Sequence, residues 1–137
     1  MIKAILPERG TDHYGSGAWG ASRGTRTHKG IDYVAPVGAI ILSPIVGEVT
    51  KHGRPYADDD TLKYIELTDD EDYQWRFFYV LPLLSVGEQV FFGDSIGTVQ
   101  DLTVRYSEGM TNHCHFELKR GGHHLGEHEF KTVAGII

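Results

Sequence analysis

Short strand-like runs of mostly apolar and β-branched residues, bounded by turns or breaks, constrain the fold of this chain more than any other feature. The runs span residues 39–43, 45–53, 61–69, 73–81 and 112–120. Within the second run, GEVTKH alternates with the period of two that is typical of a half-buried β-strand. Glycines at positions 87, 93 and 97 separate further short β segments, and no segment has the apolar period of a helix of three turns. The sequence therefore predicts an all-β or nearly all-β fold with a twisted antiparallel β-sheet.

Composition narrows the classes of protein to which the chain can belong. Its 137 residues are enough for one domain with a core. A formal charge of −6 argues against a nucleic-acid binder, which needs a basic face. The only cysteine, Cys114, excludes an intramolecular disulfide and a cysteine-rich zinc site. No apolar run reaches the 18 residues or so of a membrane span. We therefore expect a single domain over residues 1–137, no nucleic-acid partner and no membrane span.

The first part of the chain is irregular. Residues 10–30, GTDHYGSGAWGASRGTRTHKG, are rich in glycine and small polar residues and have no steady period. A long irregular segment inside a small domain is typically functional or mobile. We expect residues 1–27 to form a loop region that packs beside a substrate groove. Tyr14, Trp19 and Arg23 are candidates for substrate contact there, with Arg23 holding a carboxylate, and a packing role is the alternative.

The segment NHCHFEL, residues 112–118, places two histidines on one face of a strand. Residues i and i+2 of a strand point the same way, so His113 and His115 project together while Cys114 points toward the core. For such a pair standing alone, the simplest interpretation is the polar face of a surface strand. Glu117 shares this face, where it would either orient a site histidine or serve a structural role.

A second segment, THKGIDY, supplies further groups of the same kind. His28 and Asp32 are four residues apart, and the glycine-rich approach favours a loop that enters a strand. Both side chains can then point into the same groove. Two neutral imidazoles and one carboxylate suit Zn²⁺, with water in the fourth position. A further histidine that is free of the metal would serve as the general base for that water.

These segments resemble the LytM/lysostaphin-type zinc metallopeptidases, the peptidase family M23. HKGID fits the family motif H-x-G-x-D, and HCHFEL fits H-x-H-[FI]-E. Between them, APVGAIILSPIVGEVTKHG resembles a strand pair of the family, and VGEQVFFGDSIGTV resembles its glycine-containing turn. The likeness extends over residues 24–120, with the motifs in the order of the family.

The resemblance implies a function and a set of site residues. His28, Asp32 and His115 would bind one Zn²⁺ per chain, and His113 would be the catalytic general base. The implied substrates are peptide cross-links or stem peptides of bacterial peptidoglycan. The implied fold is a twisted antiparallel sheet with the metal site in a groove on its face.

One departure from the family pattern affects the expected activity. Family enzymes carry a Y-x-H-l motif whose histidine helps to stabilise the oxyanion, and the corresponding segment here is FFYVLPLL. Tyr79 matches the tyrosine and is a further candidate for substrate contact, whereas Leu81 occupies the place of the histidine. Loss of one oxyanion donor typically lowers the rate by about 10²–10³-fold. A slow enzyme is therefore expected unless another group takes over. The candidates in flanking loops are His13, Tyr14, His52 and Tyr56.

The same departure occurs in a subset of the family, the LECT-type chemotaxins, which keep the zinc site but act by binding. The spacing of Tyr106, Met110, His113 and His115 resembles theirs, but their disulfide cysteines are absent. A bacterial or phage relative therefore fits better. Because no signal peptide is evident, we expect a protein that is virion-associated or released by lysis and that acts on the cell wall. Other virion proteins are possible partners.

Two functions follow from these observations. The first is a zinc-dependent endopeptidase of a phage or bacterial lytic protein. The alternative is a wall-binding or structural module, such as a phage tail component, that keeps the metal but is catalytically weak or silent.

Other clusters have simpler interpretations. GGHH, with His123, His124 and the later His128, suggests a second metal site, but a solvated hairpin is favoured. ADDD and DDED lack the twelve-residue ligand pattern of a calcium loop and are interpreted as charged turns. The aromatic residues expected first in the core are Trp19, Trp75, Phe77 and Phe78, although Trp19 could instead line the groove.

Overall fold

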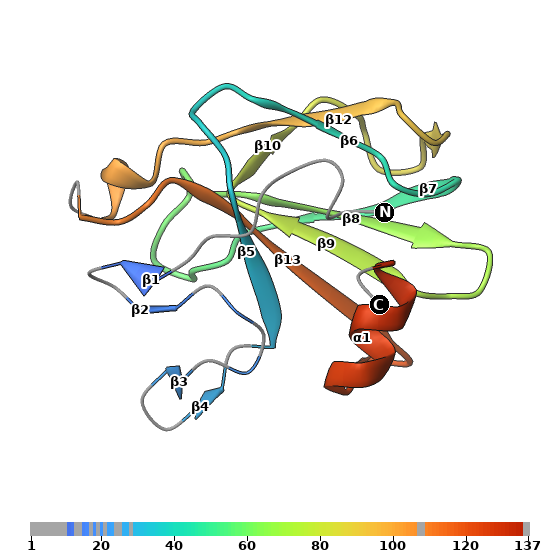
Figure 1. The fold of residues 1–137 in the computed structure, drawn as a ribbon. Helices are drawn as coiled ribbons and strands as arrows, with labels where there is room; N and C mark the ends of the chain where they lie inside the picture. The colour runs from blue at the N-terminus through green and yellow to red at the C-terminus, as the bar shows by residue number, and fades with distance from the viewer. Residues whose placement is uncertain are drawn as a thin grey trace.

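The structure, a computed structural model, consists mainly of antiparallel β-sheet (Figure 1). It describes residues 11–12, 15–16, 18, 20, 22–23, 26–27, 29–106 and 109–135. Two small ladders come first, namely β1 (Thr11–Asp12) with β2 (Gly15–Ser16) and β3 (Ser22–Arg23) with β4 (Arg26–Thr27). The later strands are β5 (Gly30–Val34), β6 (Ile40–Leu42), β7 (Gly47–Gly53), β8 (Tyr64–Asp69), β9 (Gln74–Phe78), β10 (Val80–Pro82), β11 (Gln89–Val90), β12 (Ser95–Val99), β13 (His113–Arg120) and β14 (His123–His124). A 3₁₀ turn, η2 (Leu102–Val104), and one helix, α1 (Glu127–Val133), complete the described elements.

The largest sheet has the strand order β11-β7-β8-β9-β13-β14, and β5 is its seventh strand because it pairs with β13. Every pairing in this sheet is antiparallel. β13 pairs with β9 on one edge, and on the other edge it pairs first with β5 and then with β14. Figure 1 shows β13 running between β9 and β5. The predicted antiparallel fold is therefore confirmed.

A second sheet of three strands has the order β10-β12-β6. β9 belongs to the large sheet and β10 to the small one, and a single residue, Tyr79, separates them. The φ angle of Tyr79 is 66°, in the left-handed region that an aromatic residue rarely adopts. Its backbone N–H donates to the Lys63 carbonyl at 2.7 Å, and its own carbonyl accepts from Gln100 N–H at 2.8 Å. Tyr79 therefore redirects the chain from one sheet to the other.

The hydrophobic core joins the two sheets and the helix. Phe77 and Phe116 stack in the large sheet with ring centroids 5.2 Å apart, and Phe130 of α1 packs on Phe116 at 5.4 Å. All three are fully buried. Cys114 is also buried, as predicted, and burial raises the pKa of its thiol.

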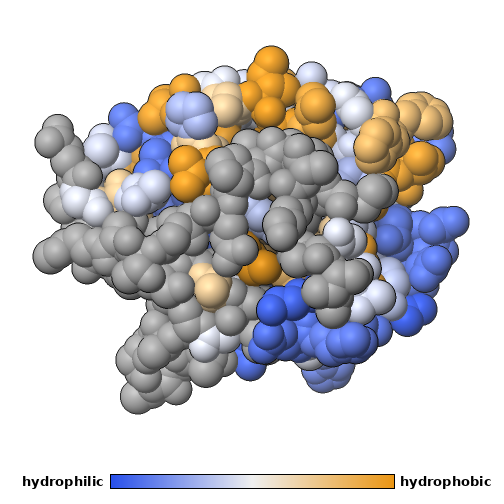
Figure 2. Space-filling model, in the orientation of Figure 1, coloured by the Kyte–Doolittle hydropathy of each residue, from blue (hydrophilic) through white to orange (hydrophobic). Residues whose placement is uncertain are grey.

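The outer face of the three-stranded sheet is apolar. Ile40, Leu42, Leu81 and Leu83 are exposed there by 54%, 37%, 49% and 54%. Figure 2 shows hydrophobic side chains gathered in the upper part of the view, where Figure 1 places β6, β10 and β12.

Three details differ from or extend the predictions. Helix α1 has seven residues and was not anticipated, because a helix of two turns gives little periodic signal. Phe78 was expected in the core, but it lies half-buried on the opposite face of the sheet from Phe77, since neighbouring residues of a strand alternate. The hairpin turn after β13 is confirmed, and Gly121 and Gly122 adopt φ angles of 60° and 81°.

No helix among the described residues is long and apolar enough to cross a membrane.

Candidate active site

The pairing of β13 with β5 brings the histidine pair next to a carboxylate. His115 lies directly opposite Asp32, and opposite residues of an antiparallel pair point to the same face. Asp32, His113 and His115 are 2%, 3% and 9% exposed. Asp32 and His115 are 83 residues apart in the sequence. The site therefore depends on a pairing between distant parts of the chain.

Gly30 makes this close pairing possible. A Cβ atom at this position would lie 2.1 Å from the carbonyl oxygen of Phe116 and 2.9 Å from Cε1 of the His115 ring. Real Cβ atoms do not approach other atoms so closely, and the first contact is with backbone that cannot move aside. The glycine of the HKGID motif therefore lets β5 lie against β13 and leaves room for the His115 ring.

We expect Gly30→Ala to lower the free energy of unfolding by about 1–3 kcal/mol, the usual cost of forcing extra atoms into a packed site. Thermal or denaturant unfolding measures this loss. Gly126→Ala is the control, because a Cβ there meets nothing within 4 Å and φ is −66°. Equal stability of the Gly30→Ala and Gly126→Ala variants would contradict this account.

A chain of hydrogen bonds runs through His115. Its Nδ1 lies 2.7 Å from Asp32 Oδ1, and its Nε2 lies 2.8 Å from Glu117 Oε2. The other oxygen of Glu117 lies 2.8 Å from Nε2 of His124. Carboxylates only accept hydrogen bonds, so the His115 ring donates from both nitrogens in this arrangement. Glu117 therefore contacts a site histidine, which is one of the two roles considered for it.

The electrostatics of the chain follow from these contacts. Burial alone would lower the pKa of His115, but the hydrogen bonds to Asp32 and Glu117 outweigh it and raise the pKa to about 9. Burial alone would raise the pKa of Glu117, but the hydrogen bonds from His115 and His124 lower it to about 2. Without a metal, the two carboxylates thus hold His115 as a cation. A metal ion on one ring nitrogen would replace one of its protons.

His113 has a different environment. Its Nδ1 lies 2.7 Å from the carbonyl oxygen of Thr111, which can only accept, so Nδ1 carries the proton. Its Nε2 faces Asp32 Oδ2 at 3.4 Å. The ring nitrogen that can take up a proton therefore points at the same carboxylate that binds His115.

Aromatic rings enclose the two histidines. Tyr79 packs edge-on against His113 with centroids 5.4 Å apart, and Phe78 packs edge-on against His115 at 5.2 Å. The Tyr79 hydroxyl is 2.9 Å from that of Tyr56, which also hydrogen-bonds to Tyr106. Burial is the main reason why the pKa of Tyr79 lies well above its usual value, so its hydroxyl stays protonated.

The structure brings together some of the predicted site residues and leaves others outside the described residues. Asp32, His113 and His115 share one cluster, and Tyr79 contacts His113. His28, Tyr14 and Trp19 lie outside the described residues. The backbone of Arg23 lies in β3, but its side chain is also outside the description.

His124 joins the cluster without having been predicted as a site residue. Its position follows from the hairpin register, in which His124 lies opposite Lys119 and two strand positions from Glu117. The motif RGGHH indicated the hairpin, but the contact with Glu117 needed the register as well.

The donor atoms at the site fit part of a zinc site. A carboxylate oxygen and an imidazole nitrogen are ligands of the type that zinc prefers, and Asp32 Oδ1 and His115 Nδ1 lie 2.7 Å apart. Ligand atoms of a tetrahedral zinc ion lie about 3.3 Å apart, given bonds of about 2.0–2.2 Å. A small outward movement of the two side chains would therefore admit the ion. Among the described residues, no group of three His, Cys, Asp or Glu is arranged as a metal site, and the third predicted ligand, His28, is not described.

Comparison of the sequence with known proteins identifies a family and a relative. Residues 26–126, which run from β4 past β14, match Peptidase family M23. Leukocyte cell-derived chemotaxin-2 of Mus musculus is 27% identical over 109 residues, which cover 80% of this chain and 71% of that protein.

Solved structures have the same fold. LytU matches with a TM-score of 0.60 and 25% identity, over 77% of this chain and 68% of LytU. Lysostaphin from Staphylococcus simulans matches with a TM-score of 0.68 and 17% identity, over 96% of this chain and 53% of lysostaphin. A zinc containing peptidase from Vibrio cholerae matches with a TM-score of 0.53 and 26% identity, over 67% of this chain but only 26% of that protein.

Proposed function

Because the chain belongs to peptidase family M23, we propose that it is a zinc-dependent endopeptidase that cleaves cross-links or stem peptides of bacterial peptidoglycan as part of a phage or bacterial lytic protein. One observation carries this proposal. Asp32 contacts His115 at 2.7 Å with one oxygen and faces His113 at 3.4 Å with the other. This cluster of one carboxylate and two buried histidines can supply two metal ligands, Asp32 and His115, and a base, His113.

The proposed ligands of the metal are His28, Asp32 and His115. A bound Zn²⁺ would lower the pKa of a water molecule and polarise the scissile carbonyl. Glu117 accepts the hydrogen bond from His115 Nε2. This leaves Nδ1, which faces Asp32, as the ring nitrogen that would bind the metal. Partners of this kind orient metal-binding histidines and increase their basicity.

The proposed general base is His113. The Thr111 carbonyl fixes the proton on Nδ1, so Nε2 is available to take a proton from the attacking water. Tyr79 packs edge-on against the ring and restricts its rotation. The protonated imidazole would then pass its proton to the leaving amine, as a base of this type does in the second half of the reaction.

Glu117→Gln is expected to weaken zinc binding by about 10–100-fold, the usual effect of changing a partner of a metal-binding histidine. Glutamine keeps the size of the side chain but removes its charge. Competition with a chromogenic chelator measures the change. Glu127→Gln on α1 is a matched control, because Glu127 is exposed and bonds only to Lys131 in the described structure. Unchanged zinc affinity in Glu117→Gln would argue for a purely structural role.

The experiment that tests the proposed function is mass-spectrometric analysis of purified peptidoglycan after digestion with the zinc-loaded protein. New peptide termini should appear, and prior treatment with a chelator should prevent them. The masses of the fragments also identify the bond that is cut. Intact peptides after long incubation with fully loaded protein would rule out the endopeptidase.

A second candidate is a wall-binding or structural module that keeps the metal but is catalytically weak or silent. The observation in its favour is Leu81, which stands at the position of the family's histidine. Leu81 is hydrophobic and 49% exposed. This candidate predicts that the zinc-loaded protein sediments with purified cell walls and releases no peptide termini. Release of termini at a rate that depends on zinc would exclude it.

A further inference from the structure

The ring of Tyr79 lies with the histidine cluster, although the alternation of β9 would place it on the other face of the sheet. Phe77 is buried in the core and Phe78 packs on the cluster, so a regular strand would turn residue 79 back to the core. Instead, the Tyr79 ring packs edge-on against His113. The φ angle of 66° at Tyr79 allows this placement, and backbone hydrogen bonds on both sides of the residue hold it. Backbone strain that is held in this way is typical of functional sites.

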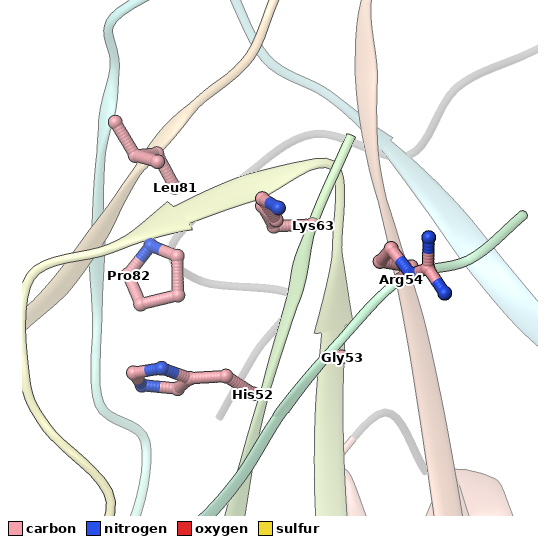
Figure 3. Close-up of a pocket in the computed structure, with 6 residues that line it drawn as sticks. All are labelled: His52, Gly53, Arg54, Lys63, Leu81 and Pro82. Carbon is pink, nitrogen blue, oxygen red and sulfur yellow. The ribbon is translucent and has the colours of Figure 1, made fainter. Parts of the chain in front are cut away.

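The structure narrows down which group could replace the family's histidine. Leu81 is exposed on the outer face of the three-stranded sheet. His52 lies opposite Ile65, a fully buried core residue, so its side chain leaves the sheet on the face away from the cluster. Figure 3 shows Leu81 and His52 around a pocket of about 390 Å³, and no residue of the cluster lines this pocket. Tyr56 does reach the cluster, but only through its contact with Tyr79.

A match to the family motif two residues earlier agrees better with these positions. The motif Y-x-H-l then falls on Phe77, Phe78, Tyr79 and Val80, with an aromatic ring at its first position and an apolar residue at its last. In this match Tyr79 takes the place of the histidine. The chain therefore presents a hydroxyl group where the family motif has an imidazole.

Three tyrosine hydroxyls form a hydrogen-bonded chain that ends at Tyr79. The hydroxyl of Tyr79 lies 2.9 Å from that of Tyr56, which in turn hydrogen-bonds to the hydroxyl of Tyr106. At the far end, the guanidinium group of Arg105 hydrogen-bonds to the Tyr106 hydroxyl. The same group lies 3.8 Å from the centre of the Tyr56 ring, and it is held by Asp58 at 3.2 Å. The chain thus has a cation at one end and the histidine cluster at the other.

The cation sets the direction of the hydrogen bonds in this chain. Arginine only donates, so the Tyr106 oxygen accepts from Arg105 and its own proton turns toward Tyr56. Each hydroxyl has one proton, so Tyr56 in turn donates to Tyr79, and successive bonds polarise one another. The proton of Tyr79 then has no acceptor within the described part of the chain. It is available to an oxygen atom of a ligand.

The hydroxyl of Tyr79 stays protonated and lies within the electric field of the site. Burial is the main reason why its pKa is well above the usual value, and the Asp32 carboxylate adds to this effect. Burial and the hydrogen bond to Tyr56 also raise the pKa of Tyr106 to about 12. The chain can therefore donate a hydrogen bond at neutral pH without losing a proton to solvent.

We propose that Tyr79 is a catalytic residue that donates a hydrogen bond to the oxyanion of the scissile carbonyl, and that the chain from Arg105 to Tyr56 positions its hydroxyl. This inference rests on the proposed function, since the oxyanion forms only when a peptide is cleaved. As water adds to the carbonyl carbon, the electron pair of the C=O bond moves onto the oxygen. Tyr79 stabilises that oxygen and keeps its own proton. His113 holds the proton of the water until the C–N bond breaks and the leaving amine takes it up.

Tyr79→Phe removes the hydroxyl but keeps the ring that packs against His113. It should lower kcat for the release of peptide termini by about 10²–10³-fold, the usual cost of losing one oxyanion donor, while KM and zinc content stay unchanged. Tyr73→Phe is the matched control. It removes a tyrosine hydroxyl that bonds to Glu129 and Arg120, outside the cluster, and it should keep the wild-type rate.

A second measurement does not depend on cleavage. Methylphosphonate is a small tetrahedral oxyanion that needs no particular peptide sequence, and its binding to the zinc-loaded protein is measured by calorimetry. The wild type should bind it about 10–100-fold more tightly than Tyr79→Phe, as expected for one hydrogen bond to a charged oxygen. Arg105→Gln should also weaken binding, and Arg105→Lys should restore part of the loss. In the Tyr79→Phe background Arg105→Gln should have no further effect, because Arg105 acts through Tyr79.

Equal binding of methylphosphonate by the wild type and Tyr79→Phe would overturn the donor role, and a loss of the same size in Tyr73→Phe would do so as well. Additive losses in the double variant would overturn the positioning role of Arg105. Thermal unfolding and zinc content are measured on the same preparations. If Tyr79→Phe does not fold, Arg105→Gln decides, because it leaves Tyr79 in place and wild-type binding by it would overturn the chain.

The two measurements separate this inference from the proposed function. A wild type that releases no peptide termini, while Tyr79→Phe weakens methylphosphonate binding, would refute the peptidase and leave the donor standing. Equal rates of release by the wild type and Tyr79→Phe would leave the peptidase standing and refute the donor.

Discussion

Asp32→Asn is expected to lower the affinity of the protein for zinc by at least about 100-fold and to abolish measurable wall cleavage. Asparagine has the same shape but no charge, and its amide nitrogen cannot bind a metal in place of a carboxylate oxygen. Changes to the partners of metal ligands already cost about 10–100-fold, so the loss of a proposed ligand should cost more. Zinc affinity is measured by chelator competition, and cleavage by the release of new amino termini.

Because Asp32 is buried between the two histidines, Asp32→Asn is the substitution from which we expect the largest loss of zinc affinity and cleavage. Its two oxygens face His115 at 2.7 Å and His113 at 3.4 Å, and the residue is 2% exposed. One substitution therefore disturbs both the proposed metal donor and the proposed base. Asp70→Asn removes an exposed carboxylate in the turn between β8 and β9 and is the control. Stoichiometric, tight zinc binding by Asp32→Asn would show that Asp32 is not a ligand.

His113→Ala should lower the rate of wall cleavage by about 10²–10⁴-fold, the usual contribution of a general base, while zinc binding stays intact. The expected combination differs from that of Asp32→Asn because His113 is proposed to act on the water and not on the metal. Zinc content per chain and the rate of peptide release, measured on the same preparation, separate the two roles.

His123→Ala is the control for His113→Ala, because His123 is exposed on the hairpin and lies outside the histidine cluster. If His113→Ala loses its zinc, His113 is a ligand and the proposed roles of the two histidines need to be exchanged. A cleavage rate equal to that of the wild type would mean that another group serves as the base.

Most of the sheet could be predicted from the sequence because its strands are short apolar and β-branched runs bounded by turns. The run at residues 45–53 gave β7 to within two residues, and the glycine pair gave the turn after β13. The change of sheet at Tyr79 could not be predicted, since aromatic residues rarely adopt a positive φ and the apolar run of residues 77–81 contains no glycine, proline or other turn residue. Helix α1 was missed because packing of Phe130 on Phe116, a tertiary contact, stabilises it.

The candidate site was predictable to the extent that it depends on local motifs. Two histidines at i and i+2 on β13 must share a face, and the HKGID motif put Asp32 at the start of a strand. The contact between Asp32 and His115 also required the pairing of β5 with β13, which the sequence alone suggested only through family resemblance. The contact of His124 with Glu117 depends on the register of the hairpin, which leaves no local pattern in the sequence.

The separation of 83 residues between Asp32 and His115 has a consequence for how the protein matures. An unfolded chain holds these two groups far apart, so it cannot grip a metal ion with both of them. Capture of the proposed zinc ion would therefore follow the closure of β5 onto β13, a contact of high sequence separation that forms slowly. An ion that binds only the closed form would oppose reopening of that edge by mass action. Under the proposed function, metal supply would stabilise chains in which β5 has paired with β13 and leave the others more exposed to proteolysis.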